Sequence, residues 1–183
     1  LIVLTNTKDL PEAGRSNLAG EEARRTGFDI KEVAYLFNLL SQQAQVPLTF
    51  ASPRGGECTI DPLSMKASEQ DEEVKKFMRN KEALEMIKQT QKLEEIKPER
   101  YQAIIFPGGP GCLFDLPHNQ KINQLVQQIW EHNQGYVCTI GHGIAALVNV
   151  KQSHQQEYLL KGKKVTCNTI EEEKDMQLDK ALP

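Results

Sequence analysis

The sequence predicts an α/β domain in which a mostly parallel β-sheet carries helices on both faces. Short apolar segments, typical of buried strands, alternate along the chain with segments whose apolar residues recur at helical spacing. Strands that are apolar throughout are characteristic of parallel sheets covered by helices on both sides. The length of 183 residues suits one domain, and we expect that domain to span residues 1–183.

The first half of the chain is predicted to hold two strands and one helix. A polar stretch with several glycines separates the first strand from the helix, whose apolar residues fall every three or four positions. The second strand ends at the turn cluster Pro53-Arg54-Gly55-Gly56. In chain order, the elements are a strand over 1–5, a loop over 6–25, a helix over 27–40, a strand over 47–51 and an irregular segment over 58–64.

Residues 69–100 are densely charged but of mixed sign. Val74 and Phe77 mark one apolar stripe, and Leu84 and Ile87 mark a second, which predicts two short helices that each pack by one face. A partner-binding coiled coil would need apolar heptads sustained over three or more repeats, and the sequence has none here. We therefore predict a solvated helical pair.

The second half is predicted to contain three strands and two helices, with a glycine-rich turn after each of the first two strands. The first turn reads Pro107-Gly108-Gly109-Pro110-Gly111, and the second reads Gly141-His142-Gly143. Functional sites of parallel α/β sheets lie at the carboxyl ends of the strands, so these turns mark the expected site. The elements are strands over 101–106, 136–140 and 164–167, and helices over 119–132 and 144–150.

The second turn has the layout of a nucleophile elbow. A strand runs directly into Gly141-His142-Gly143 and then into an alanine-rich helix, so the residue at the apex stands above the sheet. Amides at the start of the helix point to the same place, where they can stabilise an anion. A cysteine at the apex would be a reactive thiolate, whereas Gly141 supplies the geometry without a nucleophile. The turn by itself is also explained by a plain strand-to-helix connection.

Distinctive short motifs follow one another through almost the whole chain. They are Leu1-Ile2-Val3-Leu4-Thr5, Arg25-Thr26-Gly27-Phe28, Glu32-Val33-Ala34, Ala51-Ser52-Pro53-Arg54-Gly55-Gly56, Asp61-Pro62, Tyr101-Gln102-Ala103-Ile104-Ile105-Phe106-Pro107-Gly108-Gly109, Phe114-Asp115-Leu116-Pro117, Gly141-His142-Gly143-Ile144-Ala145-Ala146-Leu147, Gly162-Lys163-Lys164-Val165-Thr166 and Glu171-Glu172-Glu173. In this order the motifs resemble the DJ-1/PfpI superfamily, especially its Hsp31-like branch. The resemblance implies a flavodoxin-like three-layer sandwich with a strand–elbow–helix at Gly141.

The resemblance also implies roles for residues around the elbow. Glu32 matches the family glutamate that hydrogen-bonds to the nucleophilic cysteine and acts as an acid and base. His142 matches the histidine of the catalytic pair. The acid that orients this histidine matches Glu171, Glu172 or Glu173. In an enclosed site, desolvation would raise the pKa of Glu32.

Two positions depart from the family pattern. Active members place a cysteine where this chain has Gly141, and active Hsp31-like members have a histidine in the first turn where this chain has Pro110. Both departures occur together in the glutamine amidotransferase-like class 1 domain-containing proteins, also called Parkinson disease 7 domain-containing. The amides of Gly109 and His142 still match the oxyanion-hole positions. The expected binding pocket is lined by Glu32, Gly109, Pro110, Cys112, Gly141 and His142.

A true class I glutamine amidotransferase is a weaker interpretation. Its elbow reads Cys-x-Gly-His, whereas two residues separate Cys138 from Gly141 here. A shift of one residue along a strand turns a side chain to the opposite face, so Cys138 would lie within the sheet as a small buried residue. The spacing of His154 and Glu157 also differs from the His-x-Glu pair of these enzymes.

Three classes of function remain open. The first is a pseudoenzyme, a non-catalytic or degenerate relative whose elbow pocket holds a small carbonyl or polar ligand. The second is residual glyoxalase, deglycase or other acid/base chemistry run by Glu32 and His142, with Cys112 entering the pocket from the side. The third is a homo-oligomeric interaction or chaperone-like protein, with contacts through the helix of Trp130 or the charged helical pair. The superfamily resemblance implies a homodimer.

Composition excludes several other classes. The net charge of −3 gives no general attraction to nucleic acid, and no apolar run reaches the about 18 residues that membrane insertion requires. The four cysteines and four histidines lack zinc-ligand spacing, so we expect no metal and no other cofactor. The N-terminal residues show no signal-peptide pattern, and a reducing, cytoplasmic location is expected.

Both ends of the sequence carry an expectation. The first residue already lies inside an apolar run, and Hsp31-like relatives continue past the last matching motif with a helix and a final strand. We therefore expect a few N-terminal residues and this C-terminal helix and strand to lie outside the sequence. One edge of the sheet would then lack its cover.

Overall fold

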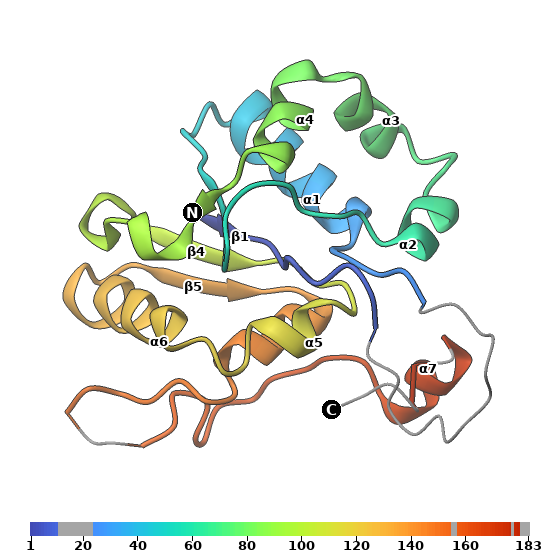
Figure 1. Cartoon of the computed structure of the whole chain (residues 1–183). Coiled ribbons are helices and arrows are strands. Elements are labelled where there is room, and N and C mark those ends of the chain that lie inside the picture. The colour runs from blue at the N-terminus through green and yellow to red at the C-terminus, as the bar shows by residue number, and fades with distance from the viewer. Residues whose placement is uncertain (11–23, 155–156, 177, 180–183) are drawn as a thin grey trace.

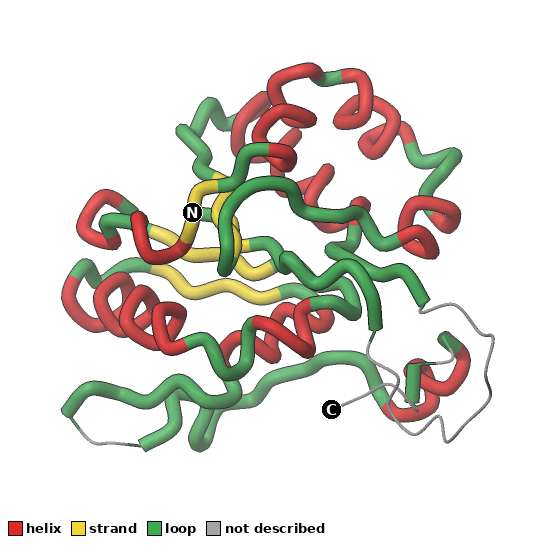
Figure 2. The backbone as a smooth tube through the Cα atoms, in the orientation of Figure 1, coloured by secondary structure: helices red, strands yellow, loops and turns green. Residues whose placement is uncertain are grey.

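Five parallel strands form the central sheet of the computed structural model, which describes residues 1–10, 24–154, 157–176 and 178–179 (Figures 1 and 2). The central strand β1 pairs with β2 on one side and with β4 on the other. In spatial order, the strands are β3 (Gln91–Lys92), β2 (Phe50–Ser52), β1 (Ile2–Val3), β4 (Ala103–Phe106) and β5 (Tyr136–Thr139).

Helices cover both faces of this sheet, as the alternation of strand and helix patterns predicted. Figure 1 shows α1, α3 and α4 on one face and α5 and α6 on the other. The α-helices are α1 (Ile30–Phe37), α2 (Pro62–Ala67), α3 (Glu72–Arg79), α4 (Lys81–Lys88), α5 (Cys112–Asp115), α6 (Gln120–Gln127) and α7 (Ile170–Asp175). Further helical turns are Asn38–Gln43, Leu93–Glu95, Pro98–Arg100, Gln128–His132 and η5 (Gly141–Leu147).

Two hydrophobic cores lie on the two faces of the sheet. Successive side chains of a strand point to opposite faces, and Ile2 therefore joins one core while Val3 joins the other. The first core contains Phe37 and Phe77, whose rings meet edge to face at 5.4 Å and hold α1 against α3. The predicted parallel α/β sheet and the packing of the charged helical pair by one face are both confirmed.

Several boundaries differ from the predictions. Residues 164–167 form no strand, because Val165 and its neighbours are exposed and pair with no described strand; Figure 2 draws them as a loop. The segment predicted to be irregular contains α2, which Asp61 caps and Pro62 begins, a recognised start signal. The helix after the elbow is a 3₁₀ helix that begins at Gly141 itself. Most of the predicted loop over 6–25 lies outside the described residues.

Candidate functional site

The two glycine-rich turns meet at the carboxyl ends of β4 and β5. A Cβ atom added to Gly108 would lie 2.9 Å from the His142 nitrogen, and one added to Gly143 would lie 2.0 Å from the Phe106 carbonyl oxygen. A Cβ on Gly109 would lie 2.5 Å from the Asp29 nitrogen. Real side chains do not tolerate such contacts with backbone. Glycine at 108 and 143 therefore lets the two turns pack together, and glycine at 109 lets the first turn pack against the segment before α1.

Gly141 occupies the apex of the elbow under different constraints. Its φ of +46° lies in the left-handed region that glycine adopts most readily. An added Cβ would lie 2.9 Å from Glu32 Oε1, and its next contact would be the same carboxyl's Cδ at 3.9 Å. Apart from the chain neighbours of Gly141 and the backbone of its own helix, only this flexible carboxyl comes within 4 Å among the described residues. The space above the apex is therefore open and bordered by Glu32.

The first turn of α1 holds Glu32 at this site. The Asp29 carboxylate caps the helix by accepting the Lys31 and Glu32 amides, at 2.8 and 3.1 Å. The Gly108 amide donates to Glu32 Oε2, while Oε1 has no hydrogen-bond partner in the described part of the chain. Burial raises the pKa of Glu32 to about 7; the Gly108 amide opposes this shift and the Asp29 charge adds to it. The carboxyl is therefore a mixture of acid and base near neutral pH.

His142, the residue after the apex, is paired with Glu173 of α7. Its Nε2 lies 2.7 Å from Glu173 Oε1, and both side chains are buried. Asn168 Nδ2 lies 3.3 Å from the same ring nitrogen. Glu173 thus fixes the orientation of the imidazole, and Nδ1 of His142 is left without a partner among the residues that the structure describes. The second oxygen of Glu173 is buried and likewise has no described partner.

The start of α7 selects Glu173 from the three candidate glutamates. Thr169 and Glu172 form a reciprocal capping box, with Thr169 N donating to Glu172 Oε2 at 2.7 Å. Glu171 and Glu172 are exposed, so neither faces His142. The sequence carried a usable signal, because Thr-x-x-Glu starts a helix whose fourth residue is Glu173. Asn168 carried no signal of this kind.

Two predicted pocket residues, Pro110 and Cys112, lie in the first glycine-rich turn and directly after it. The Cys112 side chain is completely buried in the core beside α6, where its Sγ donates to the Pro107 carbonyl at 3.4 Å. Burial raises the pKa of this thiol well above its ordinary value. The Cys112 thiol is therefore not accessible to a ligand at the elbow. Pro110 lies in the turn before α5, where its carbonyl accepts the Leu113 amide. Cys138, predicted to be buried, is exposed on β5.

A buried polar cluster beside the elbow was missed entirely by the sequence analysis. Asp115 accepts from Thr5 Oγ1 at 2.8 Å and from the Asn6 amide at 2.7 Å. Arg54 donates to the Asn6 carbonyl at 2.9 Å. Burial raises the pKa of Asp115. These contacts fix the loop after β1 to the last residue of α5, at the same edge of the sheet as the elbow.

The sequence of the chain also matches a known protein family. A sequence model described as the DJ-1/PfpI family matches residues 25–181. The chain belongs to the DJ-1/PfpI family. No helix in the described ranges is both long and apolar enough to cross a membrane.

Individual DJ-1/PfpI relatives share moderate similarity with the chain. Glutamine amidotransferase-like class 1 domain-containing protein 1 of Bos taurus is 32% identical over 81 residues, 44% of this chain and 36% of that protein. Glutathione-independent glyoxalase hsp3101 of Schizosaccharomyces pombe is 30% identical over 131 residues, 69% of this chain and 53% of that protein. The chain therefore aligns with about a third to a half of these relatives. They confirm the predicted superfamily and branch.

A solved structure gives the same fold. The rapid encystment protein of Francisella tularensis superposes with a TM-score of 0.85 at 28% identity, covering 100% of this chain and 75% of that one. The similarity confirms the predicted flavodoxin-like α/β fold.

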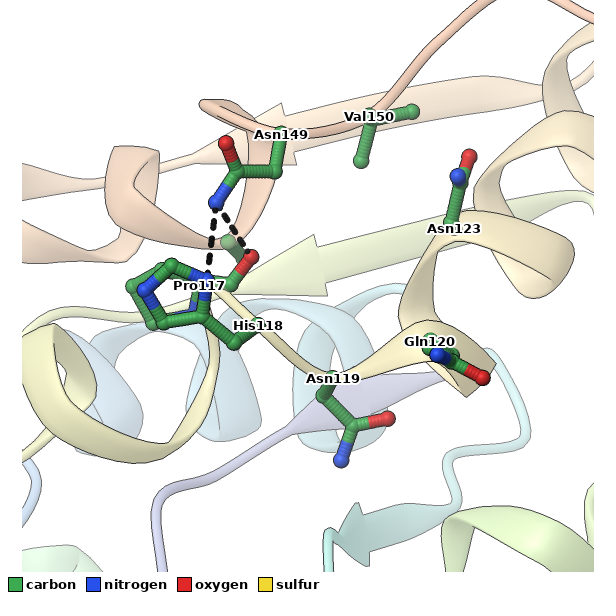
Figure 3. A pocket seen from close by; sticks show the side chains of 8 residues that line it. Pro117, His118, Asn119, Gln120, Asn123, Asn149 and Val150 are labelled. Carbon is green, nitrogen blue, oxygen red and sulfur yellow. Dashed lines mark hydrogen bonds between the residues drawn. The ribbon is translucent and has the colours of Figure 1, made fainter.

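A separate pocket of about 180 Å³ lies beyond the end of η5 (Figure 3). Asn149 donates to the Pro117 carbonyl at 2.9 Å and contacts His118 Nδ1 at 3.3 Å. The lining residues are Pro117, His118, Asn119, Gln120, Asn123, Ala146, Asn149 and Val150. None of the elbow's acid or base groups lines this pocket.

Replacing Asp29 separates its two effects on Glu32. Asn caps a helix about as well as Asp, so Asp29→Asn keeps the helix start and removes one cause of the raised Glu32 pKa. We expect the pKa of Glu32 to fall in this variant, as measured by NMR titration of its carboxyl. Asp29→Ala loses the cap and should cost about 1 kcal/mol in urea denaturation. An unchanged pKa in Asp29→Asn would contradict the electrostatic contribution of Asp29.

The pH dependence of stability reports the state of Glu32. Because its pKa rises from 4.5 to about 7 on folding, the folded state holds this proton more tightly than the unfolded chain does. The free energy of unfolding of the wild type should therefore fall, relative to Glu32→Gln, as pH rises through this window. Allowing for partial exposure, we expect about 2 kcal/mol, measured by urea denaturation on either side of the window. A difference independent of pH would refute the shift.

Proposed function

We propose that this DJ-1/PfpI domain binds a small carbonyl compound at the elbow and does not convert it through a cysteine adduct. Gly141 carries the proposal: it holds the apex position at φ +46° and faces Glu32 Oε1. Covalent catalysis at a carbonyl needs a nucleophile at the apex. Glycine offers none, and the Cys112 thiol is buried in the core.

Two backbone amides support binding of a carbonyl oxygen. Gly109 and His142 are buried residues, and neither amide donates to another residue in the described ranges. Buried N–H groups are almost always paired with protein or water. A ligand oxygen at this position would accept these hydrogen bonds, as in an oxyanion hole.

The class of carbonyl is suggested by Glu32 and by the family. With a pKa of about 7, Glu32 is partly protonated near neutrality and can donate to a carbonyl oxygen. Relatives such as hsp3101 are named glyoxalases, enzymes of 2-oxoaldehydes. We therefore assign the ligand to the 2-oxoaldehyde class.

Acid/base activity is the second candidate function, and the position of Glu32 favours it. Glu32 Oε1 faces the open apex without a described partner, and its pKa lies near the operating pH, where general acid–base catalysis is most efficient. His142 Nδ1 is the second group without a described partner. This chemistry would act on the bound carbonyl without any enzyme thiol.

Restoring the nucleophile tests the first proposal. Wild-type protein without added thiol should consume methylglyoxal no faster than buffer, whereas Gly141→Cys should gain turnover. Gly141→Ala is the matched control, since both side chains bear the strain of positive φ, about 1–2 kcal/mol. Circular dichroism checks that both variants fold. Thiol-free turnover by the wild type would end the proposal.

Binding is tested separately with hydroxyacetone, an unreactive analogue of a 2-oxoaldehyde. We expect its addition to shift the amide NMR signals of Gly109 and His142 in the wild type. If the ionised carboxylate of Glu32 contacts the ligand, the shifts should be weaker in Glu32→Gln than in the wild type, at a pH where Glu32 is ionised in the wild type. Absence of any shift at these amides would show that the elbow binds no carbonyl.

Two expectations about the whole molecule stay predictions. The family resemblance implies a homodimer, and Trp130, which was expected to form contacts, is 43% exposed. Light scattering of the purified protein measures the oligomeric state. The cytoplasmic location is tested by imaging of a tagged full-length protein.

A further inference from the structure

We infer that the pocket beyond the end of η5 binds a neutral hexose, with side-chain amides on the sugar hydroxyls and an apolar floor against one face of the ring (Figure 3). The pocket holds about 180 Å³, whereas pockets for drug-sized ligands begin at about 300 Å³. Its size therefore suits one sugar ring. No group of the elbow takes part, so the inference stands apart from the proposed function.

The polar lining of the pocket consists of amides and one imidazole. Among the described residues that line it are three asparagines, one glutamine and one histidine, but no Asp, Glu, Lys or Arg. A charged ligand would exchange its water shell for neutral dipoles without meeting an opposite charge, which is costly. The lining therefore suits a neutral ligand that both donates and accepts hydrogen bonds.

Asn149 fixes the first wall of the pocket. Its Nδ2 donates to the Pro117 carbonyl at 2.9 Å and lies 3.3 Å from His118 Nδ1. Because a carbonyl oxygen only accepts, the amide nitrogen faces Pro117, and Oδ1 of Asn149 is left to accept from a ligand. The same nitrogen donates to Nδ1 of a neutral His118, whose proton is then on Nε2. This wall thus offers one acceptor and one donor.

The opposite wall belongs to the start of α6 and offers donors. Asn119 Oδ1 caps the helix by accepting the Lys121 amide at 3.0 Å, and Asn123 Oδ1 accepts the Lys151 amide at 3.4 Å. With these oxygens in use, each asparagine presents an Nδ2 group that has no partner in the described part of the chain. Figure 3 shows Asn123 across the pocket from Asn149. The two walls therefore present donors and an acceptor in fixed positions around one space, as the hydroxyls of a hexose require.

The floor of the pocket is apolar and consists of Ala146 and Val150. These residues are only 1% and 2% exposed, so they belong to the core, and Figure 3 shows Val150 between the two walls. A hexose has a ring face of C–H groups as well as a rim of hydroxyls. It can therefore cover the floor while its hydroxyls meet the amides of both walls, and the apolar contact adds to binding. A polyol without a ring lacks such a face.

The experiment titrates the wild-type protein with D-glucose, D-galactose and D-mannose, and follows the side-chain amide NMR signals of Asn119, Asn123 and Asn149. At least one hexose should give saturable shifts with a Kd of about 1 mM, as expected for a ligand of about twelve non-hydrogen atoms. Glycerol, which has no ring, and D-glucuronate, which brings a charge, should each bind at least about 10-fold more weakly. Methyl α-glycosides of the same hexoses stand in for the end of a glycan: binding of the glycosides assigns the pocket to glycan ends, and binding of the free hexoses alone assigns it to free sugars.

Two variants test the walls without disturbing the helix. Asn119→Asp and Asn123→Asp keep the oxygen that accepts a backbone amide and remove the free NH₂ group, so each should weaken hexose binding by about 10-fold, read at the Asn149 signal. Asn80→Asp is the matched control, because Asn80 caps α4 by accepting the Ala83 amide at 3.0 Å and would gain the same charge outside the pocket. It should bind as the wild type does.

Three results would overturn the inference. The first is the absence of saturable shifts with all three hexoses. The second is wild-type affinity in both Asn119→Asp and Asn123→Asp, which would place the sugar elsewhere. The third is binding of glycerol or D-glucuronate as tight as that of the best hexose, which would show that neither the ring face nor the neutrality of the ligand matters.

Discussion

The hydrogen bond from the Gly108 amide to Glu32 Oε2 joins the elements on which the site depends. It connects the end of β4 to the first turn of α1, and it does so beside the elbow, because Gly108 also packs against the His142 nitrogen. Burial of this carboxyl is tolerated because one oxygen is paired and the raised pKa allows protonation. The same hydrogen bond leaves Oε1 directed at Gly141. It therefore fixes both the position of the carboxyl and the side of the apex that Oε1 borders.

The sequence predicted the parts of this arrangement that repeat or that need glycine. Alternating apolar periods predicted the parallel sheet, and the Gly-His-Gly turn predicted the elbow, since a strand entering a tight turn leaves few other geometries. The failures have local causes. Val165 and Thr166 favour a strand, but no strand in the described ranges lies beside them to pair with. Helix α5, with four residues, is too short to show a helical period.

Contacts that join distant segments were harder to predict. The pairing of His142 with Glu173 spans 31 positions, and its choice among three glutamates follows from the capping box at Thr169. The cluster of Asp115 with Thr5 and Asn6 spans about 110 positions and leaves no periodic trace. The family resemblance indicated the region that supplies the partner of His142, residues 171–173, but not which glutamate it is. Only the fold assigned the individual side chains.

With glycine at the apex, no side chain at position 141 connects Glu32 with the His142–Glu173 pair. Glu32 is held from α1 and β4, and His142 is held from α7, and no hydrogen bond in the described part of the chain links the two side chains. The Cβ of a side chain at position 141 would lie 2.9 Å from Glu32 Oε1. With glycine there, the proposed ligand would supply the connecting atoms. The geometry of this site is fixed by the backbone packing of the two turns, whereas its proposed chemistry depends on the ligand that would bind above Gly141.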